Sequence, residues 1–372
     1  MDTHFRDPAR DVGGGRVVGI RPVQPSPAAS RRIRVLKVVL SLTVVGLLFG
    51  VFLPQVADFG DVWRVLDQMT WLEVLTLCAA AAWNLITYWI LMMTALPGLS
   101  FAQSMVAIET STAIANTMPG GPAFGMGISY RMFSSWGFTP RAVTLAVTVS
   151  GLADLFAKLA MPAAAVVFLV ATGDTAPGLV PIAAIGGAVL IGLTGVFWMT
   201  LHSETGARRA GEILQRAAAP ILRWRGKEEG AGWSEAFAKF RREVVVLLAT
   251  RRWWLIAASF LSHVSLFLVL LLALRHVGIA DHQVEWDEAL GAFAFVRFLS
   301  AVPITPGGLG VVELGLSAAL AYAGGPRAEV VAAVLVFRAL TFLIQIPFGA
   351  ITYSYWQHSS RWRSARPTPD TS

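Results

Sequence analysis

Charged residues are scarce in this sequence of 372 residues: Asp, Glu, Lys and Arg make up 14% of it, whereas 55% of the residues are apolar. The mean hydropathy is +0.61. A soluble domain of this length carries far more charge on its surface, so the composition excludes that class. It is typical of a polytopic membrane protein, in which most side chains face lipid or other helices.

Cysteine and the usual signatures of metal and nucleotide sites are also missing. Cys78 is the only cysteine, so an intrachain disulfide is excluded, and the six histidines are scattered without an HExxH motif. No G-x-x-x-x-G-K-[ST] loop occurs, so the sequence gives no sign of ATP as a driving force. We therefore expect no metal and no cofactor.

The distribution of apolar residues predicts six full membrane spans, because about 20 apolar residues cross the hydrocarbon core. The six are 38–57, 74–96, 142–171, 179–201, 253–274 and 328–356, of which the first, second and fourth contain no charged residue. His263 lies near the middle of its span. An intramembrane histidine is more typical of an interhelical hydrogen bond than of a proton relay.

Two other apolar regions, 101–135 and 288–323, are interrupted by proline and glycine. The breaks consist of Pro119, Gly120 and Gly121 in the first region and of Pro306, Gly307, Gly308 and Gly310 in the second. Proline removes a backbone donor and glycine lowers helix stability, so neither region forms one continuous helix. Each half is too short to span comfortably, which favours re-entrant hairpins or pairs of short, tilted crossings. Loops between ordinary helices are the simpler alternative.

Basic residues are concentrated in three segments, and this predicts the orientation. Residues 1–37, 202–252 and 357–372 hold eight, eleven and three of the 30 Lys and Arg, so the positive-inside rule places them in the cytoplasm. We expect a disordered basic tail over 1–34, a transmembrane domain over 35–356 and a cytoplasmic tail over 357–372. Basic loops beside spans also account for the net charge of +7 through contact with anionic lipid, without nucleic acid.

The two broken regions belong to a repeat. "NTMPGGPAFGMGISYRMFSSWGFTPRAVTLAV" at 116–147 and "PITPGGLGVVELGLSAALAYAGGPRAEVVAAV" at 303–334 share a Pro-Gly-Gly and then, about 20 residues further on, a Pro-Arg-Ala. Each unit, about 74–171 and 253–356, consists of a span, a broken hairpin and a second span. Counting crossings from a cytoplasmic N-terminus makes the two units inverted, an arrangement that many secondary transporters share.

Charged residues inside the apolar segments are expensive in a membrane and are therefore expected to face a partner or water. They are Glu109, Arg131, Asp154, Lys158, Arg297, Glu313 and Arg338. Residues at matching positions of the two repeats have opposite charges. Glu109 lies before the first break, and Arg297 lies at a similar distance before the second break. One hypothesis is a single network across the repeat interface. Structural ion pairing, with Asp154 and Lys158 as an i,i+4 pair, is the alternative.

"PITPGGLGVVE", with Arg297 before it and Arg338 after it, and the earlier "NTMPGG…YRMFSSWG…SGLAD" resemble the transmembrane region of lysylphosphatidylglycerol synthases, a flippase-like membrane family. The resemblance covers roughly residues 35–356. The first motif departs from the family pattern, which more often has an acid where this chain has "PAFGMG". The resemblance implies an integral membrane domain that moves or accommodates a polar-headed lipid. Only 16 residues follow the last predicted span, so we expect no aminoacyl-transferase domain and no enzymatic activity.

The function predicted from the sequence is a lipid flippase or lipid-linked transporter of the bacterial inner membrane, with anionic phospholipid as the partner. The candidate substrate-binding residues are Arg297, Glu313, Arg338, Glu109 and Asp154. In this hypothesis the breaks place helix starts inside the protein, where backbone N–H groups meet an anionic head group. The expected site is mixed: Arg297 and Arg338 attract the lipid phosphate, while Glu313, in the first turn after the second break, holds those arginines or meets a cationic head group. Two alternatives remain: a non-transporting scaffold, as a homo-oligomer or beside an envelope enzyme, and an enzyme acting on lipid within the membrane.

Overall fold

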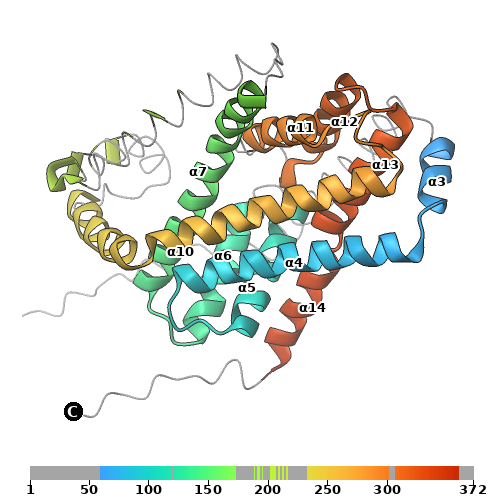
Figure 1. Cartoon of the computed structure of the whole chain (residues 1–372). Helices are drawn as coiled ribbons and strands as arrows, with labels where there is room; N and C mark the ends of the chain where they lie inside the picture. The colour runs from blue at the N-terminus through green and yellow to red at the C-terminus, as the bar shows by residue number, and fades with distance from the viewer. Residues whose placement is uncertain are drawn as a thin grey trace, which may run out of the picture.

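The computed structural model describes residues 59–118, 121–172, 233–300 and 306–359, with scattered positions between 188 and 216, and every regular element in this part of the chain is a helix (Figure 1). The elements are α3 (Phe59–Asp67), α4 (Trp71–Ala95), α5 (Phe101–Thr117), α6 (Gly121–Ser135), α7 (Pro140–Thr172), α10 (Trp233–His276), α11 (Trp286–Leu299), the 3₁₀ turn η2 (Pro306–Gly308), α12 (Val311–Tyr322), α13 (Arg327–Arg338), the π-helical turn η3 (Ala339–Leu343) and α14 (Gln345–His358).

Four segments are long and apolar enough to cross a membrane, and each matches a predicted span. They are Trp71–Ala95, Pro140–Pro162, Arg241–His276 and Arg327–His358. The predicted span 38–57 lies outside the described residues, and 179–201 lies almost entirely outside them. The protein is therefore a multi-pass helical membrane protein, whereas the count of six spans stays a prediction.

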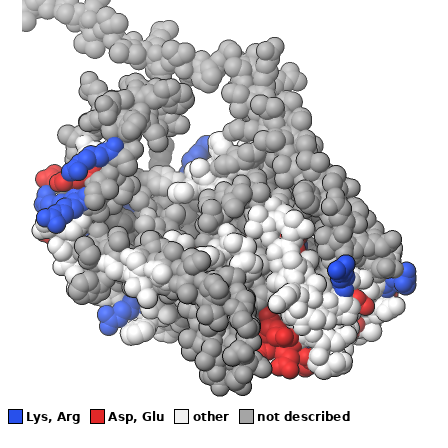
Figure 2. All heavy atoms as spheres, turned by 90° about the horizontal axis from the view of Figure 1, so that it is seen from above, with Lys and Arg blue, Asp and Glu red and all other residues white. Residues whose placement is uncertain are grey.

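Uncharged surface is extensive, as expected for helices that face lipid. Large apolar side chains such as Trp253, Phe260 and Ile351 are 65–70% exposed. Among the described residues, charged side chains form separate groups on the face drawn in Figure 2, and white uncharged residues lie between some of them. In water such apolar exposure would indicate an interaction site, but on membrane spans it is the surface that lipid tails cover.

Both predicted breaks are present. The first region divides into α5 and α6, which pack against each other, and the second into α11 and α12, which also pack together with η2 between them. Gly121 begins α6 at a close approach, because a Cβ there would overlap the Ala115 carbonyl oxygen. Pro119 and Gly120 lie outside the described residues. Whether the hairpins are re-entrant or cross fully is a question of membrane placement and stays a prediction.

Each of the two units consists of a span, a broken hairpin and a second span, and the hairpin of each unit packs against the last span of the other. Helices α4 and α10, the first span of each unit, run side by side (Figure 1). Helix α5 of the first unit packs on α14 of the second, and α11 of the second packs on α7 of the first. This reciprocal contact agrees with two repeats of one plan. Their inverted orientation across the membrane stays a prediction.

Polar side chains join α4 to α10 at the centre of the bundle. Asn84 donates from Nδ2 to the Ser262 carbonyl oxygen at 3.0 Å and to Ser265 Oγ at 2.8 Å. Thr87 Oγ1 lies 3.3 Å from the same Ser265 hydroxyl. All four residues are at most 2% exposed. Interhelical hydrogen bonds of this kind fix the position of one span against another where the hydrophobic effect cannot do so.

The last span is irregular at its middle. Arg338 ends α13, and the chain then forms the π-helical turn η3, in which the Ile344 N–H donates to the Ala339 carbonyl oxygen at 3.0 Å. Pro347 follows in α14 and has no N–H to donate to the Leu343 carbonyl. A π-helical turn next to a proline widens the helix locally and turns its side chains. Here it places Arg338 and Phe342 toward the interior.

Helix α10 is much longer than the predicted span 253–274 that it contains. Its 44 residues extend about 66 Å at 1.5 Å per residue, roughly twice the hydrocarbon thickness. Its first part, Trp233–Arg252, is the end of the segment 202–252 that the sequence places in the cytoplasm. That segment is therefore helical where the structure describes it continuously, and the helix extends beyond the bilayer core.

Candidate functional site

A cavity of about 630 Å³ lies between the two units, at the places where their helices cross. Its polar lining comes from both units and includes Tyr88, Glu109, Asn116, Asp154, Lys158, Arg297, Arg338 and Gln345. The glycines of the second break, Gly307 and Gly308, line it as well. Four of the five predicted substrate-binding residues therefore face one cavity. The fifth, Glu313, lies directly behind Arg338.

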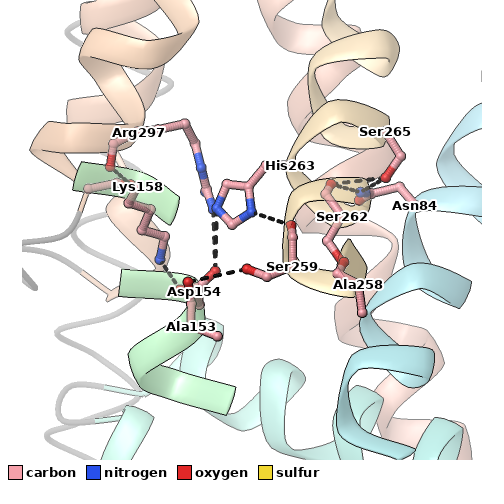
Figure 3. Close-up of polar contacts among 11 residues, drawn as sticks. Asn84, Ala153, Asp154, Lys158, Ala258, Ser259, Ser262, His263, Ser265 and Arg297 are labelled. Atoms are coloured by element: carbon pink, nitrogen blue, oxygen red, sulfur yellow. Dashed lines mark hydrogen bonds and ion pairs between the residues drawn. The ribbon is translucent and has the colours of Figure 1, made fainter. Parts of the chain in front are cut away.

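One group of charges, which we call the Asp154 cluster, consists of Asp154, Lys158, His263 and Arg297 (Figure 3). Asp154 Oδ2 is 2.6 Å from Lys158 Nζ, and Asp154 Oδ1 is 3.5 Å from His263 Nε2 and 3.9 Å from Arg297 Nη2. The cluster joins α7, α10 and α11. The expected i,i+4 pair of Asp154 and Lys158 is present, and it is part of a larger group.

His263 is held in one tautomer by its neighbours. Its Nδ1 lies 2.9 Å from the Ser259 carbonyl oxygen, which can only accept, so Nδ1 carries the proton. Nε2 then presents its lone pair to Arg297 Nη2 at 3.4 Å (Figure 3). The geometry is that of a neutral histidine that supports Arg297. It agrees with the interhelical role that the sequence favours over a relay.

A second group of charges joins the break to the last span. Arg338 Nε donates to Glu313 Oε1 at 2.6 Å, and Arg338 Nη2 donates to the Gly307 carbonyl oxygen at 3.1 Å. Glu313 Oε2 accepts from the Gly310 N–H at 2.7 Å. The guanidinium also stacks over the Phe342 ring, 4.2 Å from its centroid. We call Glu313, Arg338 and the Gly307 carbonyl the Glu313–Arg338 clasp.

The start of α12 carries an acid of the chain itself in its first turn, as the sequence indicates. Glu313 stands in the first turn and uses its own carboxylate to bind the N–H of the N-cap residue Gly310. An acid at this position satisfies an orphan donor and suits the helix dipole, so the protein itself supplies the anion. The cavity lining at this helix start therefore includes the Arg338 side chain rather than bare backbone donors alone.

The glycines of the second break adopt conformations that other residues avoid. Gly307, Gly308 and Gly310 have φ of +60°, +70° and +81°. A Cβ on Gly307 would overlap the Phe342 ring and lie 2.9 Å from Asn116 Oδ1. The break thus needs glycine for backbone geometry and also for the close approach of the two units. The expected structural role of these positions fits the geometry.

Glu109 stands apart from both charged groups. Its Oε1 accepts the indole N–H of Trp89 at 2.7 Å, while its Oε2 has no hydrogen-bond partner among the described residues. The side chain is 1% exposed. Arg131, the remaining charge considered from the sequence, is exposed and does not line the cavity.

Four of the five predicted residues thus line one cavity, with Glu313 behind Arg338, but the five do not form the single network that the sequence suggested. They are divided between the Asp154 cluster, the Glu313–Arg338 clasp and a lone Glu109. The crossing of α11 and α7 brings Arg297 to Asp154, whereas Glu313 pairs with Arg338 within the second unit. Sequence reasoning missed Tyr88, Trp89, Asn116 and Phe342. Aromatic residues are common throughout these spans, so nothing in the pattern marked the ones at the cavity.

The fold and cavity define a multi-pass helical membrane protein with charged residues from two packed units around an internal space. The family model described as "Lysylphosphatidylglycerol synthase TM region" matches residues 35–349, and the chain belongs to that family. No curated protein matches the chain significantly. The family and the architecture together indicate a membrane protein of lipid metabolism or transport.

Proposed function

We propose that this protein is a lipid flippase that receives the anionic head group of a phospholipid in the cavity between its units and moves it between the leaflets of the inner membrane. The observation that carries the proposal is the position of charges from both units on one internal cavity of about 630 Å³. Volumes of about 300–1,000 Å³ are typical of sites for small polar ligands. The proposed role involves no chemical change in the lipid.

The charge balance of the cavity favours an anion. Lys158, Arg297 and Arg338 are basic, and the carboxylates paired with them are Asp154 and Glu313. One positive charge therefore remains in excess of these pairs. A phosphodiester carries one negative charge, and guanidinium groups match the geometry of its oxygens.

Arg297 is the side chain best suited to meet the phosphate. Its Nε is buried without a hydrogen-bond partner, and its Nη2 makes only long contacts of 3.4 Å to His263 and 3.9 Å to Asp154. A buried donor without a partner is costly, and an arriving phosphate oxygen would satisfy it. The tighter contact of Arg338 to Glu313, at 2.6 Å, leaves that guanidinium less free to turn.

A non-transporting scaffold is the alternative. A scaffold has no use for buried charges around an internal space, since each charged group costs roughly 2.5–3.5 kcal/mol at a helix centre on insertion scales. A translocator needs such groups to shelter a polar head group from lipid tails. The charged lining therefore favours the flippase.

The test is lipid movement in liposomes. Purified protein is reconstituted with phosphatidylglycerol labelled on one acyl chain, and the fraction of label in the outer leaflet is followed with a membrane-impermeant quencher. We expect faster exchange between leaflets than in protein-free liposomes, and a return to the protein-free rate for Arg297→Gln. Arg327→Gln, at an exposed position that begins α13, is the matched control and should behave as the parent.

Two outcomes would refute the proposal. The first is a parent protein that inserts as a monodisperse species and yet leaves every labelled lipid of a panel at the protein-free rate. The second is equal activity of the parent and Arg297→Gln. A panel that includes zwitterionic and neutral lipids shows whether the anionic charge is the recognised feature.

A further inference from the structure

Three carboxyl groups belong to the cavity and its walls, and Glu109, the most buried of them, lacks a cation. Asp154 is paired with Lys158 and Glu313 with Arg338, each at 2.6 Å. Glu109 has no ion pair among the described residues, and its one hydrogen bond comes from the neutral indole of Trp89 at 2.7 Å. Its free oxygen, Oε2, is fully buried on a side chain that lines the cavity.

The elements packed against α5 bring no charge to Glu109. On α14 the crossing consists of Gly349, where a Cβ would overlap the Glu109 carbonyl oxygen, and of Thr352, which bonds to Thr110 at 3.0 Å. Among the titratable and charged groups of the neighbouring elements, Tyr88 of α4 lines the cavity, Arg131 of α6 is exposed, and Tyr353 and His358 of α14 bond within their own helix. None of these four is a hydrogen-bond or ion-pair partner of Glu109.

Across the cavity lie the Asp154 cluster and Arg338, whose charges satisfy one another. An ionised carboxylate that is buried in an apolar bundle with a single neutral donor is costly, because neither water nor a cation stabilises its charge. The protonated acid avoids that cost. It still accepts the Trp89 N–H at Oε1, and it carries its hydrogen on Oε2, the atom without a partner.

The proton on Glu109 also sets the charge of the cavity. With Glu109 protonated, the basic residues exceed the carboxylates by one charge, as counted above. With Glu109 ionised the excess disappears, and a third carboxylate is present when the phosphate arrives. An anionic head group and a proton therefore favour each other's binding in the same cavity.

We propose that Glu109 is a proton-binding site that couples proton uptake to the binding of an anionic lipid head group. In the uptake step a hydronium ion transfers its proton to Oε2 and leaves as water, and release is the reverse. The inference rests on the proposed function, because the lipid is the coupled ligand. It makes the flippase a proton–lipid symporter, so that a proton gradient can drive lipid movement.

The first test measures binding of short-chain phosphatidylglycerol to the purified protein in detergent at a series of pH values. In the parent, affinity should fall about tenfold as pH rises, within the range typical of coupling between two sites. Glu109→Gln imitates the protonated acid and should keep the low-pH affinity throughout. Glu329→Gln, a carboxyl of the first turn of α13 that does not line the cavity, should follow the parent.

A second measurement detects the proton directly and does not depend on lipid movement. Infrared difference spectra should contain the carbonyl band of a protonated carboxylic acid, and Glu109→Gln should remove it. In Trp89→Phe the ionised carboxylate loses its only donor, so the band should persist to higher pH than in the parent. This variant keeps the carboxyl in place and therefore tests the proposal even if Glu109→Gln does not fold.

The outcomes separate the two proposals. Lipid binding that is independent of pH in the parent, absence of the acid band, or loss of low-pH affinity in Glu109→Gln would overturn the proton site, and the last result would make Glu109 a head-group ligand. A sodium requirement that replaces the pH dependence would also overturn it. Failure of the parent to bind phosphatidylglycerol at any pH would instead refute the proposed function, whatever the infrared band shows.

Discussion

Removal of one charge from the Glu313–Arg338 clasp should destabilise the protein strongly. The pair joins Arg338 Nε to Glu313 Oε1 at 2.6 Å, and the two side chains are 11% and 5% exposed. In Glu313→Gln the guanidinium loses its anion within the bundle. Both carboxylate oxygens accept hydrogen bonds, one from Arg338 Nε and one from the Gly310 N–H, so the new amide nitrogen takes the place of one acceptor and leaves that donor without a partner. Breaking a buried ion pair from one side costs about 3–5 kcal/mol, and we expect a loss of that size.

The double variant Glu313→Gln/Arg338→Gln leaves no stranded charge, so its cost should be well below the sum of the single costs. We expect an interaction free energy of about 2–3 kcal/mol between the two sites. The assay is equilibrium unfolding in mixed micelles with a denaturing detergent, followed by circular dichroism, with the exposed Arg327→Gln as control. Additive costs, or single variants within about 1 kcal/mol of the parent, would show that water screens the pair and that the clasp is not buried.

Three further outcomes are expected. Gly307→Ala forces a side chain into a positive-φ position against the Phe342 ring, and should lower stability by more than about 1 kcal/mol in the same unfolding assay. Gly349→Leu pushes α14 away from an α5 carbonyl oxygen, and should lower both the melting temperature in detergent and the rate of lipid exchange. In a Cys78→Ala background, single cysteines in 202–252 should resist impermeant thiol reagents in intact cells, whereas labelling from outside would refute the cytoplasmic placement.

The spans and breaks were predictable because each depends on local chemistry. A run of apolar residues has to cross the bilayer as a helix, and the run of proline and glycine at 306–310 disfavours a continuous helix. The four spans within the described residues and the divided regions on either side of each break accordingly match the predictions. The family follows from the second motif in the same way, since its spacing is kept within a short stretch of chain.

The pairing of the charges was not predictable, because it depends on how distant helices cross. The cost of a charge in a membrane indicates that Glu109 and Arg297 have a role, but it does not say which side chain each one meets. Opposed signs at matching repeat positions suggested that the two would belong to one network. In the structure α11 crosses α7 at Asp154, while α5 crosses α14 at Gly349, so that only Arg297 finds an opposite charge there.

The two arginines of the cavity consequently differ in what they can do. Arg297 can turn toward a phosphate without stranding its neighbour, because Asp154 keeps Lys158 at 2.6 Å. Arg338 cannot turn away without leaving Glu313 unpaired, because it is the one cation within ion-pair distance of Glu313 in the part of the chain that the structure describes. It also donates a hydrogen bond to the Gly307 carbonyl oxygen. An alternating site needs both kinds of group: one that exchanges partners as the ligand comes and goes, and one that keeps the broken helix in place. If the protein moves lipid as proposed, the lengths of the contacts, 3.9 Å for Arg297 to Asp154 and 2.6 Å for Arg338 to Glu313, favour Arg297 for the first role and Arg338 for the second.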